Sequence, residues 1–286
     1  MKQFMKIGFN EATAMKKSNL ETDLLLAEKY QYDYIEIRMD MLNAYLEKHS
    51  VKELASFFAC SRLKPYAFNA IEEVNFPDSR SFEKKAGEIK RLCEIAQQIG
   101  NPYMIAVPSF RNETLKTKNK DEIQKDSVEV LNKLADITEK YGVHIAFEPV
   151  GFPACAVRDM NTAWEIVKKV DRKSVGLVID AFNVYIYDRL SDIDVLDTID
   201  MDKVFVFHIN DCEGNIPLSK IELNHRVWPG EGIIPLNRML SIFYAKGFQK
   251  IASLELFREE YWELDPDEVF RTGMEKTRKQ LEFNYK

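Results

Sequence analysis

Short apolar segments rich in β-forming residues recur from the first residues of the chain to the last, and longer amphipathic stretches separate them. The starts of successive segments lie about 27 to 47 residues apart, which is the length of a strand and helix with varying loops. The predicted strands are residues 6–10, 33–38, 64–69, 103–108, 143–148, 175–180, 204–208 and 251–255.

The stretches between the strands show helical periodicity. In residues 81–100, apolar side chains recur at steps of three and four, and Gly100 ends the pattern. Residues 121–142 repeat this arrangement up to Gly142, and residues 266–281 close the chain in a similar way. We therefore expect amphipathic helices between the strands.

Eight strands, each followed by a helix, predict an α/β protein with a (β/α)8 TIM barrel, because right-handed crossovers between parallel strands permit that closure. A doubly wound open sheet is the structural alternative. Its dinucleotide-binding form has a glycine-rich turn after the first strand, whereas residues 10–17 read NEATAMKK. Since no linker-like stretch divides the chain, we expect a single domain over residues 1–286.

Composition and charge indicate which kinds of molecule the chain is able to bind. The chain has 286 residues and a net charge of -6, which argues against a broad basic face for nucleic acid. No apolar run has the length of a membrane helix, and the N-terminal segment lacks the pattern of a secretory signal. We expect a reduced, cytoplasmic protein that binds a small molecule and neither nucleic acid nor membrane; a homo-oligomer is compatible with the sequence.

Histidine and cysteine are scarce, with four of each, and the cysteines lie far apart in the sequence. A site that needs several imidazole or thiolate ligands is therefore nearly excluded. Metal chemistry in this chain must depend mainly on carboxylates.

Four ionisable residues stand at the ends of consecutive predicted strands, where a barrel brings side chains to one mouth. They are Glu148, Asp180, His208 and Glu255, each following an apolar run. A lone acidic residue there is more often a helix cap than a ligand. Four together are hard to obtain from capping alone, so the pattern favours one divalent metal ion, with Mn²⁺, Zn²⁺, Co²⁺ and Mg²⁺ all compatible with these ligands.

Several motifs carry a family resemblance. FEPVG surrounds Glu148, GLVIDAFN surrounds Asp180, FHINDC surrounds His208, SLELF surrounds Glu255, and RVWPGEG spans residues 226–232. With these motifs the chain resembles the sugar phosphate isomerase/epimerase family of xylose isomerase-like barrels. FNEAT, YDYIEIR, RVWPG and ELFREEY make it most similar, within that family, to the inosose isomerases of bacterial myo-inositol catabolism.

The resemblance implies a metal-dependent isomerase. Glu148, Asp180, His208 and Glu255 would bind the cation, and Glu148 and Glu255 would share the proton transfers as catalytic residues. The expected reaction shifts a carbonyl between adjacent carbons of 2-keto-myo-inositol, an inosose, through a cis-enediol.

Other residues are expected to bind substrate. Arg226 matches the family arginine that holds substrate oxygen atoms, and Glu36, Asn69 and Trp228 are candidates to line the mouth. Asn183 stands where many family members have a histidine. An asparagine forms hydrogen bonds but does not titrate near neutral pH, so substrate preference or rate can differ here.

Alternative functions stay open at this stage. A ketose 3-epimerase, a hydroxypyruvate isomerase or a dehydroshikimate dehydratase would use a similar site, and a sugar-binding barrel without turnover is the non-enzymatic alternative. A DNA-repair endonuclease of this fold uses a three-zinc cluster, which needs more histidines than this chain supplies.

Overall fold

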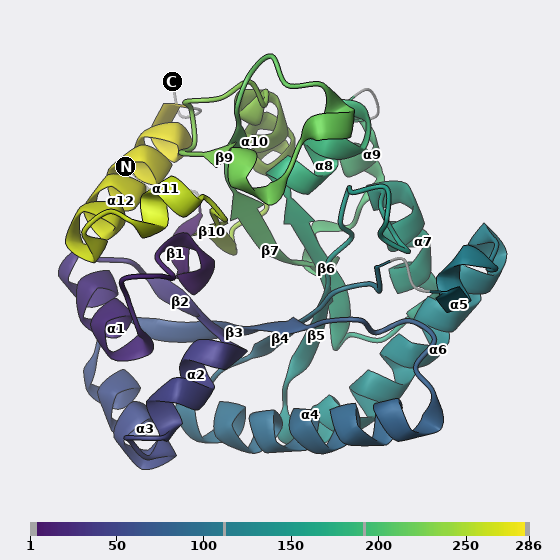
Figure 1. Ribbon diagram of the computed structural model, residues 1–286, viewed down its shortest axis with the longest axis horizontal. Helices are drawn as coiled ribbons and strands as arrows, with labels where there is room; N and C mark the ends of the chain where they lie inside the picture. The colour runs from purple at the N-terminus through teal and green to yellow at the C-terminus, as the bar shows by residue number, and fades with distance from the viewer. Residues whose placement is uncertain (1–4, 111–112, 191–192, 284–286) are drawn as a thin grey trace.

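The computed structural model describes residues 5–110, 113–190 and 193–283. Eight parallel strands form a closed barrel in the order β1-β10-β7-β6-β5-β4-β3-β2 (Figure 1), which confirms the predicted (β/α)8 fold. The barrel strands are β1 (Lys6–Asn10), β2 (Tyr34–Arg38), β3 (Lys64–Ile71), β4 (Tyr103–Ala106), β5 (His144–Phe147), β6 (Val175–Asp180), β7 (Val204–Ile209) and β10 (Ile251–Leu254).

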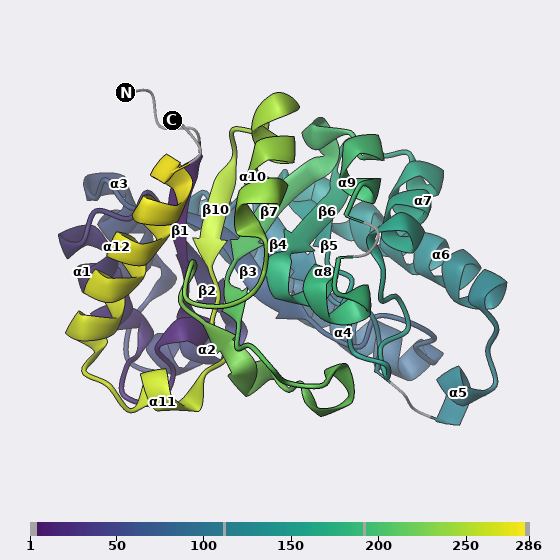
Figure 2. The same cartoon turned by 90° about the horizontal axis from the view of Figure 1, so that it is seen from above.

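Helices surround the barrel (Figures 1 and 2), and a two-stranded hairpin, β8 (Asp211–Cys212) with β9 (Arg226–Val227), follows β7. The α-helices are α1 (Leu20–Lys29), α2 (Met39–Leu46), α3 (Val51–Cys60), α4 (Ser79–Ile99), α5 (Glu113–Lys116), α6 (Lys120–Thr138), α7 (Met160–Val170), α8 (Ala181–Asp188), α9 (Val195–Thr198), α10 (Leu236–Ala245), α11 (Glu259–Trp262) and α12 (Pro266–Phe283). Short 3-10 helices are η1 (Glu11–Thr13), η2 (Glu139–Tyr141), η3 (Met201–Lys203), η4 (Leu218–Lys220) and η5 (Leu223–His225).

The predicted helix ends follow local chemistry. Helix α4 begins after Asp78, whose side chain accepts a hydrogen bond from the Ser81 N–H, and it ends at Gly100 with φ of 78°. Helix α6 continues as η2 and ends at Gly142 with φ of 72°. Both glycines were predicted to end these helices, and both adopt the left-handed conformation that is common at helix ends.

An apolar cluster fills the interior of the barrel below its mouth. It contains Tyr66, Ala67, Ala70, Ile105, Ala146, Val178, Phe205, Val206 and Ile251. Since side chains alternate between the two faces of a strand, a step of two residues along the strand leads from Ala146 to Glu148, from Val178 to Asp180 and from Val206 to His208. The apolar interior thus gives way to a polar layer at the carboxyl ends of the strands.

The single domain expected over residues 1–286 includes residues 1–4 and 284–286, which lie outside the described part of the chain. Within the described ranges, none of the helices combines the length and the apolar character needed to cross a membrane.

Candidate metal centre and active site

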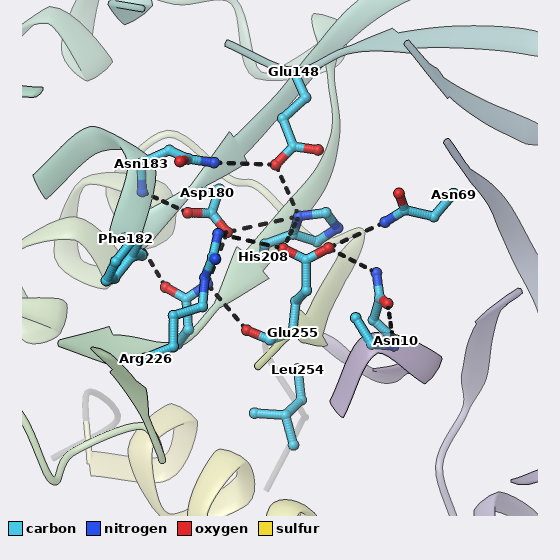
Figure 3. A network of polar contacts seen from close by, with 12 residues as sticks. Asn10, Asn69, Glu148, Asp180, Phe182, Asn183, His208, Arg226, Leu254 and Glu255 are labelled. Atoms are coloured by element: carbon cyan, nitrogen blue, oxygen red, sulfur yellow. Dashed lines mark hydrogen bonds and ion pairs between the residues drawn. The ribbon is translucent and has the colours of Figure 1, made fainter. Parts of the chain in front are cut away.

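The four predicted metal ligands lie together at the barrel mouth (Figure 3). Glu148, Asp180, His208 and Glu255 are all buried, and each offers one ligand atom, these atoms lying within 4.8 Å of one another. Pairing of β6 with β7 sets Asp180 beside His208. Glu148 and Glu255 follow β5 and β10 by one residue, so these two strands end slightly earlier than predicted.

The His208 ring presents its two nitrogens to different partners. Its Nδ1 lies 3.3 Å from Glu148 Oε1, 3.4 Å from Glu255 Oε2 and 3.8 Å from Asp180 Oδ2. Its Nε2 lies 3.1 Å from Glu36 Oε1. Nδ1 is therefore the nitrogen that faces the cluster.

Negative charge is in excess in this buried layer. Burial and the neighbouring Glu148 carboxylate raise the pKa of Glu255 to about 8, against the opposing effect of the His208 charge. Burial alone would lower the pKa of His208, but Glu255, Glu36 and Glu148 raise it well above its ordinary value. Convergent, desolvated oxygen and nitrogen ligands with excess negative charge fit a divalent cation.

Two asparagines hold Glu255. Asn10 Nδ2 and Asn69 Nδ2 donate to Glu255 Oε1 at 3.0 and 3.1 Å (Figure 3). Asn10 Oδ1 also accepts from the Ala12 N–H and so caps η1. Glu255 Oε2 is left to face His208 and Arg226.

Asp180 has a comparable set of contacts. Its Oδ1 accepts from the Asn183 N–H at 2.6 Å, as the N-cap of α8, and its Oδ2 accepts from Asn210 Nδ2 at 2.7 Å. Asn210 also accepts from the Phe182 N–H through Oδ1. Asn210 was not predicted as a site residue. Its position offered one indication, because it is a polar residue two positions after His208 in a segment that is otherwise largely buried.

Arg226 lies at the start of β9 with its guanidinium carbon 4.4 Å from the Phe182 ring centroid and 5.1 Å from that of Phe257. Its Nη2 is 3.5 Å from Asp180 Oδ2 and 3.7 Å from Glu255 Oε2. Arg226 Nε and Nη1 are buried without a hydrogen-bond partner among the described residues. The guanidinium therefore has hydrogen-bonding capacity that the described protein groups do not use.

Asn183 lies on α8, where its Nδ2 is 3.4 Å from Glu148 Oε1. Its Oδ1 is buried and, within the described part of the chain, has no hydrogen-bond partner. Asn183 therefore has an unused acceptor, and it lines the same cavity as Arg226.

A cavity of about 410 Å³ opens over the cluster. Three of the predicted substrate residues line it, namely Asn69, Asn183 and Arg226, and so do the two glutamates of the cluster, Glu148 and Glu255. The wall also includes Met39, Val107, Phe110, Val150, Leu223 and Phe257. A hollow of about 810 Å³ at the opposite end of the barrel is lined by strand starts such as Lys6 and Tyr34 and lies away from the cluster.

Two other residues expected to contact substrate lie elsewhere. Glu36 is fully buried against His208 and is not part of the cavity wall, because its carboxylate points at the far side of the imidazole. Trp228 is buried and stacks on Tyr261, with ring centroids 4.3 Å apart, so its face is already covered. Neither residue lines this cavity, and the expected contact of Glu36 and Trp228 with substrate stays a prediction.

Together, the closed barrel and the buried carboxylate and imidazole cluster define a (β/α)8 barrel protein with a candidate mononuclear metal site at its mouth. The model of the xylose isomerase-like TIM barrel family matches residues 24–280, and the chain belongs to this family.

Several known proteins are similar over nearly the whole chain. The inosose isomerases of Bacillus velezensis and Bacillus subtilis are each 42% identical over 274 residues, which cover 96% of this chain and 96% of each relative. A 1.8 Å crystal structure of the IOLI protein with a binding zinc atom superposes with a TM-score of 0.93 at 41% identity, covering 98% of this chain and 99% of that one. A 3-dehydroshikimate dehydratase of Pseudomonas putida is 21% identical over 62% of this chain and 27% of that protein.

Proposed function

We propose that this protein is a metal-dependent isomerase that shifts the carbonyl of an inosose, such as 2-keto-myo-inositol, to the adjacent carbon. The observation that carries the proposal is the buried cluster of Glu148, Asp180, His208 and Glu255 beneath a cavity of ligand size. Relatives named inosose isomerase at 42% identity support the choice of substrate.

Glu148, Asp180, His208 and Glu255 would hold one divalent cation, with Mn²⁺, Zn²⁺, Co²⁺ and Mg²⁺ as candidates. When bound, the cation supplies Lewis acidity for a carbonyl and its neighbouring hydroxyl, which makes the C–H between them more acidic. The zinc of the similar crystal structure supports a metal at such a site.

Glu148 and Glu255 perform the proton transfers. One glutamate, as the carboxylate, removes the proton from the carbon that bears the hydroxyl, the C–H electron pair forms the double bond of a cis-enediolate, and the hydroxyl proton passes to the former carbonyl oxygen. The other glutamate, as the carboxylic acid, then gives its proton to the former carbonyl carbon, and the oxygen that lost its proton becomes the new carbonyl. A proton exchanged through solvent between the two carboxyl groups restores their starting states, so the net change is isomerisation of the substrate.

Arg226 and Asn183 orient the substrate. The unpartnered Nε and Nη1 of Arg226 donate to substrate oxygen atoms, and Asn183 Oδ1 accepts from a substrate hydroxyl. Asn69 lines the same cavity, and its amide already donates to Glu255. These groups favour a polyol ketone with hydroxyls on adjacent carbons.

The remaining expectations are part of the proposal. We infer one domain over residues 1–286. We also infer a cytoplasmic location, since the four cysteines are free thiols. The net charge of -6 supports a small-molecule substrate over nucleic acid.

The test is an NMR isomerisation assay with 2-keto-myo-inositol and added Mn²⁺. We expect a second ketone signal that grows with time and that is absent without metal. If 2-keto-myo-inositol stays unchanged while a ketose is converted to its 3-epimer, the protein is an epimerase and the proposed substrate is wrong. If dehydroshikimate is dehydrated instead, the reaction class itself is wrong.

A further inference from the structure

Glu36 makes a close contact outside the substrate cavity. Both of its carboxylate oxygens lie near His208 Nε2, at 3.1 and 3.2 Å, and both side chains are fully buried. Both distances lie in the range of a hydrogen bond from an imidazole N–H to a carboxylate oxygen.

The strands explain how Glu36 reaches His208. Glu36 pairs with Asn10 of β1, while His208 pairs with Ser253 of β10, so β1 and β10 separate the two residues around the barrel wall. The Glu36 side chain therefore crosses the barrel interior. The pairing of β2 with β3 shifts register between Ile35 and Glu36, and irregularities of this kind redirect side chains.

The orientation of the His208 ring follows from this contact. With Nε2–H donated to Glu36, the lone pair of neutral imidazole lies on Nδ1, which is the nitrogen that faces Glu148, Asp180 and Glu255. A carboxylate behind the ring also makes imidazole a stronger donor to a metal. The contact with Glu36 thus favours the His208 tautomer with its proton on Nε2, and it points Nδ1 toward the cluster.

We propose that Glu36 is a positioning residue of the metal centre, which acts through His208 by fixing its ring with Nδ1 toward the metal. The inference rests on the proposed metal site and adds a member to it that touches neither metal nor substrate. This role is separate from the expected one of Glu36 in substrate binding.

The first test is zinc affinity, measured by competition with a chromophoric chelator for wild type, Glu36→Gln and Glu36→Ala. We expect Glu36→Ala to bind Zn²⁺ about 10- to 100-fold more weakly. Glu36→Gln keeps an acceptor oxygen without the charge, so its loss is smaller. Glu94→Gln is the matched control, because Glu94 is an exposed carboxylate on α4 that does not line the cavity, and the zinc affinity of this variant should stay within about twofold of wild type.

The second test detects the ring itself in the zinc-loaded protein by ¹⁵N–¹H NMR, with the His208 signals assigned by their absence in His208→Gln. We expect a metal-bound Nδ1 and a protected Nε2–H in wild type. In Glu36→Ala the Nε2 proton should exchange with water faster, and in Glu36→Gln its resonance should move upfield. These signals do not depend on turnover, and the chemical shift of the Nε2 proton in folded Glu36→Gln reports the hydrogen bond to residue 36 separately from any change in stability.

The outcomes separate the two proposals. Wild-type protein that binds zinc, with unchanged affinity and an unchanged His208 spectrum in both Glu36 variants, would overturn the role of Glu36 and leave the metal centre intact. Failure of wild type to bind any Zn²⁺ would overturn the metal centre and this inference with it. If Glu36→Ala does not fold, Glu36→Gln alone decides, since it conserves size and one hydrogen bond.

Discussion

Asn10 shows how single side chains serve both the fold and the site. Its oxygen caps η1 through the Ala12 N–H, and its amide group donates to Glu255, a residue 245 positions away in the sequence. A change at Asn10 therefore affects a local turn and the site at once. The same holds for Asp180, which caps α8 and faces His208.

Sequence pattern alone predicted the four clustered residues, because each interrupts an apolar run at the end of a strand. It did not predict the contact between Glu36 and His208. Alternation along a short strand indicates which side chains point into the barrel, but it does not indicate which nitrogen of a histidine on another strand they meet. The stacking of Trp228 on Tyr261 of α11 was not predicted either, because it joins residues that are distant in the sequence and periodicity describes only local structure.

At the residue scale, Arg226→Lys tests the use of the guanidinium. Lysine keeps the charge but has neither the planar fork nor the stacking between Phe182 and Phe257. Loss of hydrogen bonds from a charged group costs about 1.5–3 kcal/mol, so we expect kcat/KM for inosose to fall about 10- to 150-fold. Steady-state kinetics at saturating metal give the value, and zinc affinity serves as the control. A kcat/KM equal to that of wild type would exclude Arg226 from substrate binding.

At the element scale, the loop after β5 packs against α8 through Gly151. A Cβ atom at this position would overlap the Asn183 carbonyl oxygen and lie 2.6 Å from Ile186 Cγ1, so α8 would have to move. Since Asn183 and the cap of α8 belong to the site, packing of this one glycine is coupled to substrate binding.

Gly151→Ala is therefore expected to lower the free energy of unfolding by about 1–3 kcal/mol and to reduce activity. Gly87→Ala is the matched control: Gly87 lies exposed within α4, nothing lies within 4 Å of its added Cβ, and alanine should stabilise the helix by about 0.5–1 kcal/mol. Urea denaturation of both variants measures these changes. Equal effects of the two substitutions would contradict the packing account.

A buried pair of carboxyl groups joins η1 to α1. Glu11 accepts from the Arg38 N–H at 2.7 Å, and Asp23 accepts from the Ser18 hydroxyl. Burial and the neighbouring Asp23 raise the pKa of Glu11 well above its ordinary value, and burial raises the pKa of Asp23 to about 7. The folded protein therefore favours a protonated carboxyl group in this pair.

The raised pKa of Asp23 sets the direction in which the free energy of unfolding changes with pH. A folded-state pKa above the unfolded value gives stability that is fully present below about pH 4 and is lost as pH rises through 7. Asp23→Asn mimics the protonated form, so between pH 5 and pH 8 its free energy of unfolding should rise relative to wild type by about 1–3 kcal/mol. Denaturation at several pH values checks this, and a difference between the two proteins that does not change with pH would refute it.

Elements were the most predictable level of the chain. All eight barrel strands and the helices α4, α6 and α12 coincide with predicted segments within a few residues, because strand length, helical period and glycine stops are local properties. The β8–β9 hairpin was not predicted, since each strand has two residues and its pairing depends on a contact across a loop.

For the whole molecule, the closed barrel brings polar residues that are distant in the sequence together in one buried layer above an apolar interior. Barrel closure was predictable from the count of strands, but the depth of the site and the excess of carboxylates around His208 required the structure. Within this polar layer, the proposed reaction has Glu148 and Glu255 move protons between adjacent carbons of a bound polyol ketone.

The most direct measurement is solvent-deuterium incorporation into 2-keto-myo-inositol in D2O, followed by ¹H NMR, for wild type, Glu255→Gln and the control Glu94→Gln, each with its metal content verified. Wild type and Glu94→Gln should exchange the proton next to the carbonyl in a metal-dependent manner, and Glu255→Gln should be slower by about 10²- to 10⁴-fold. Unchanged incorporation in metal-loaded Glu255→Gln would contradict the account.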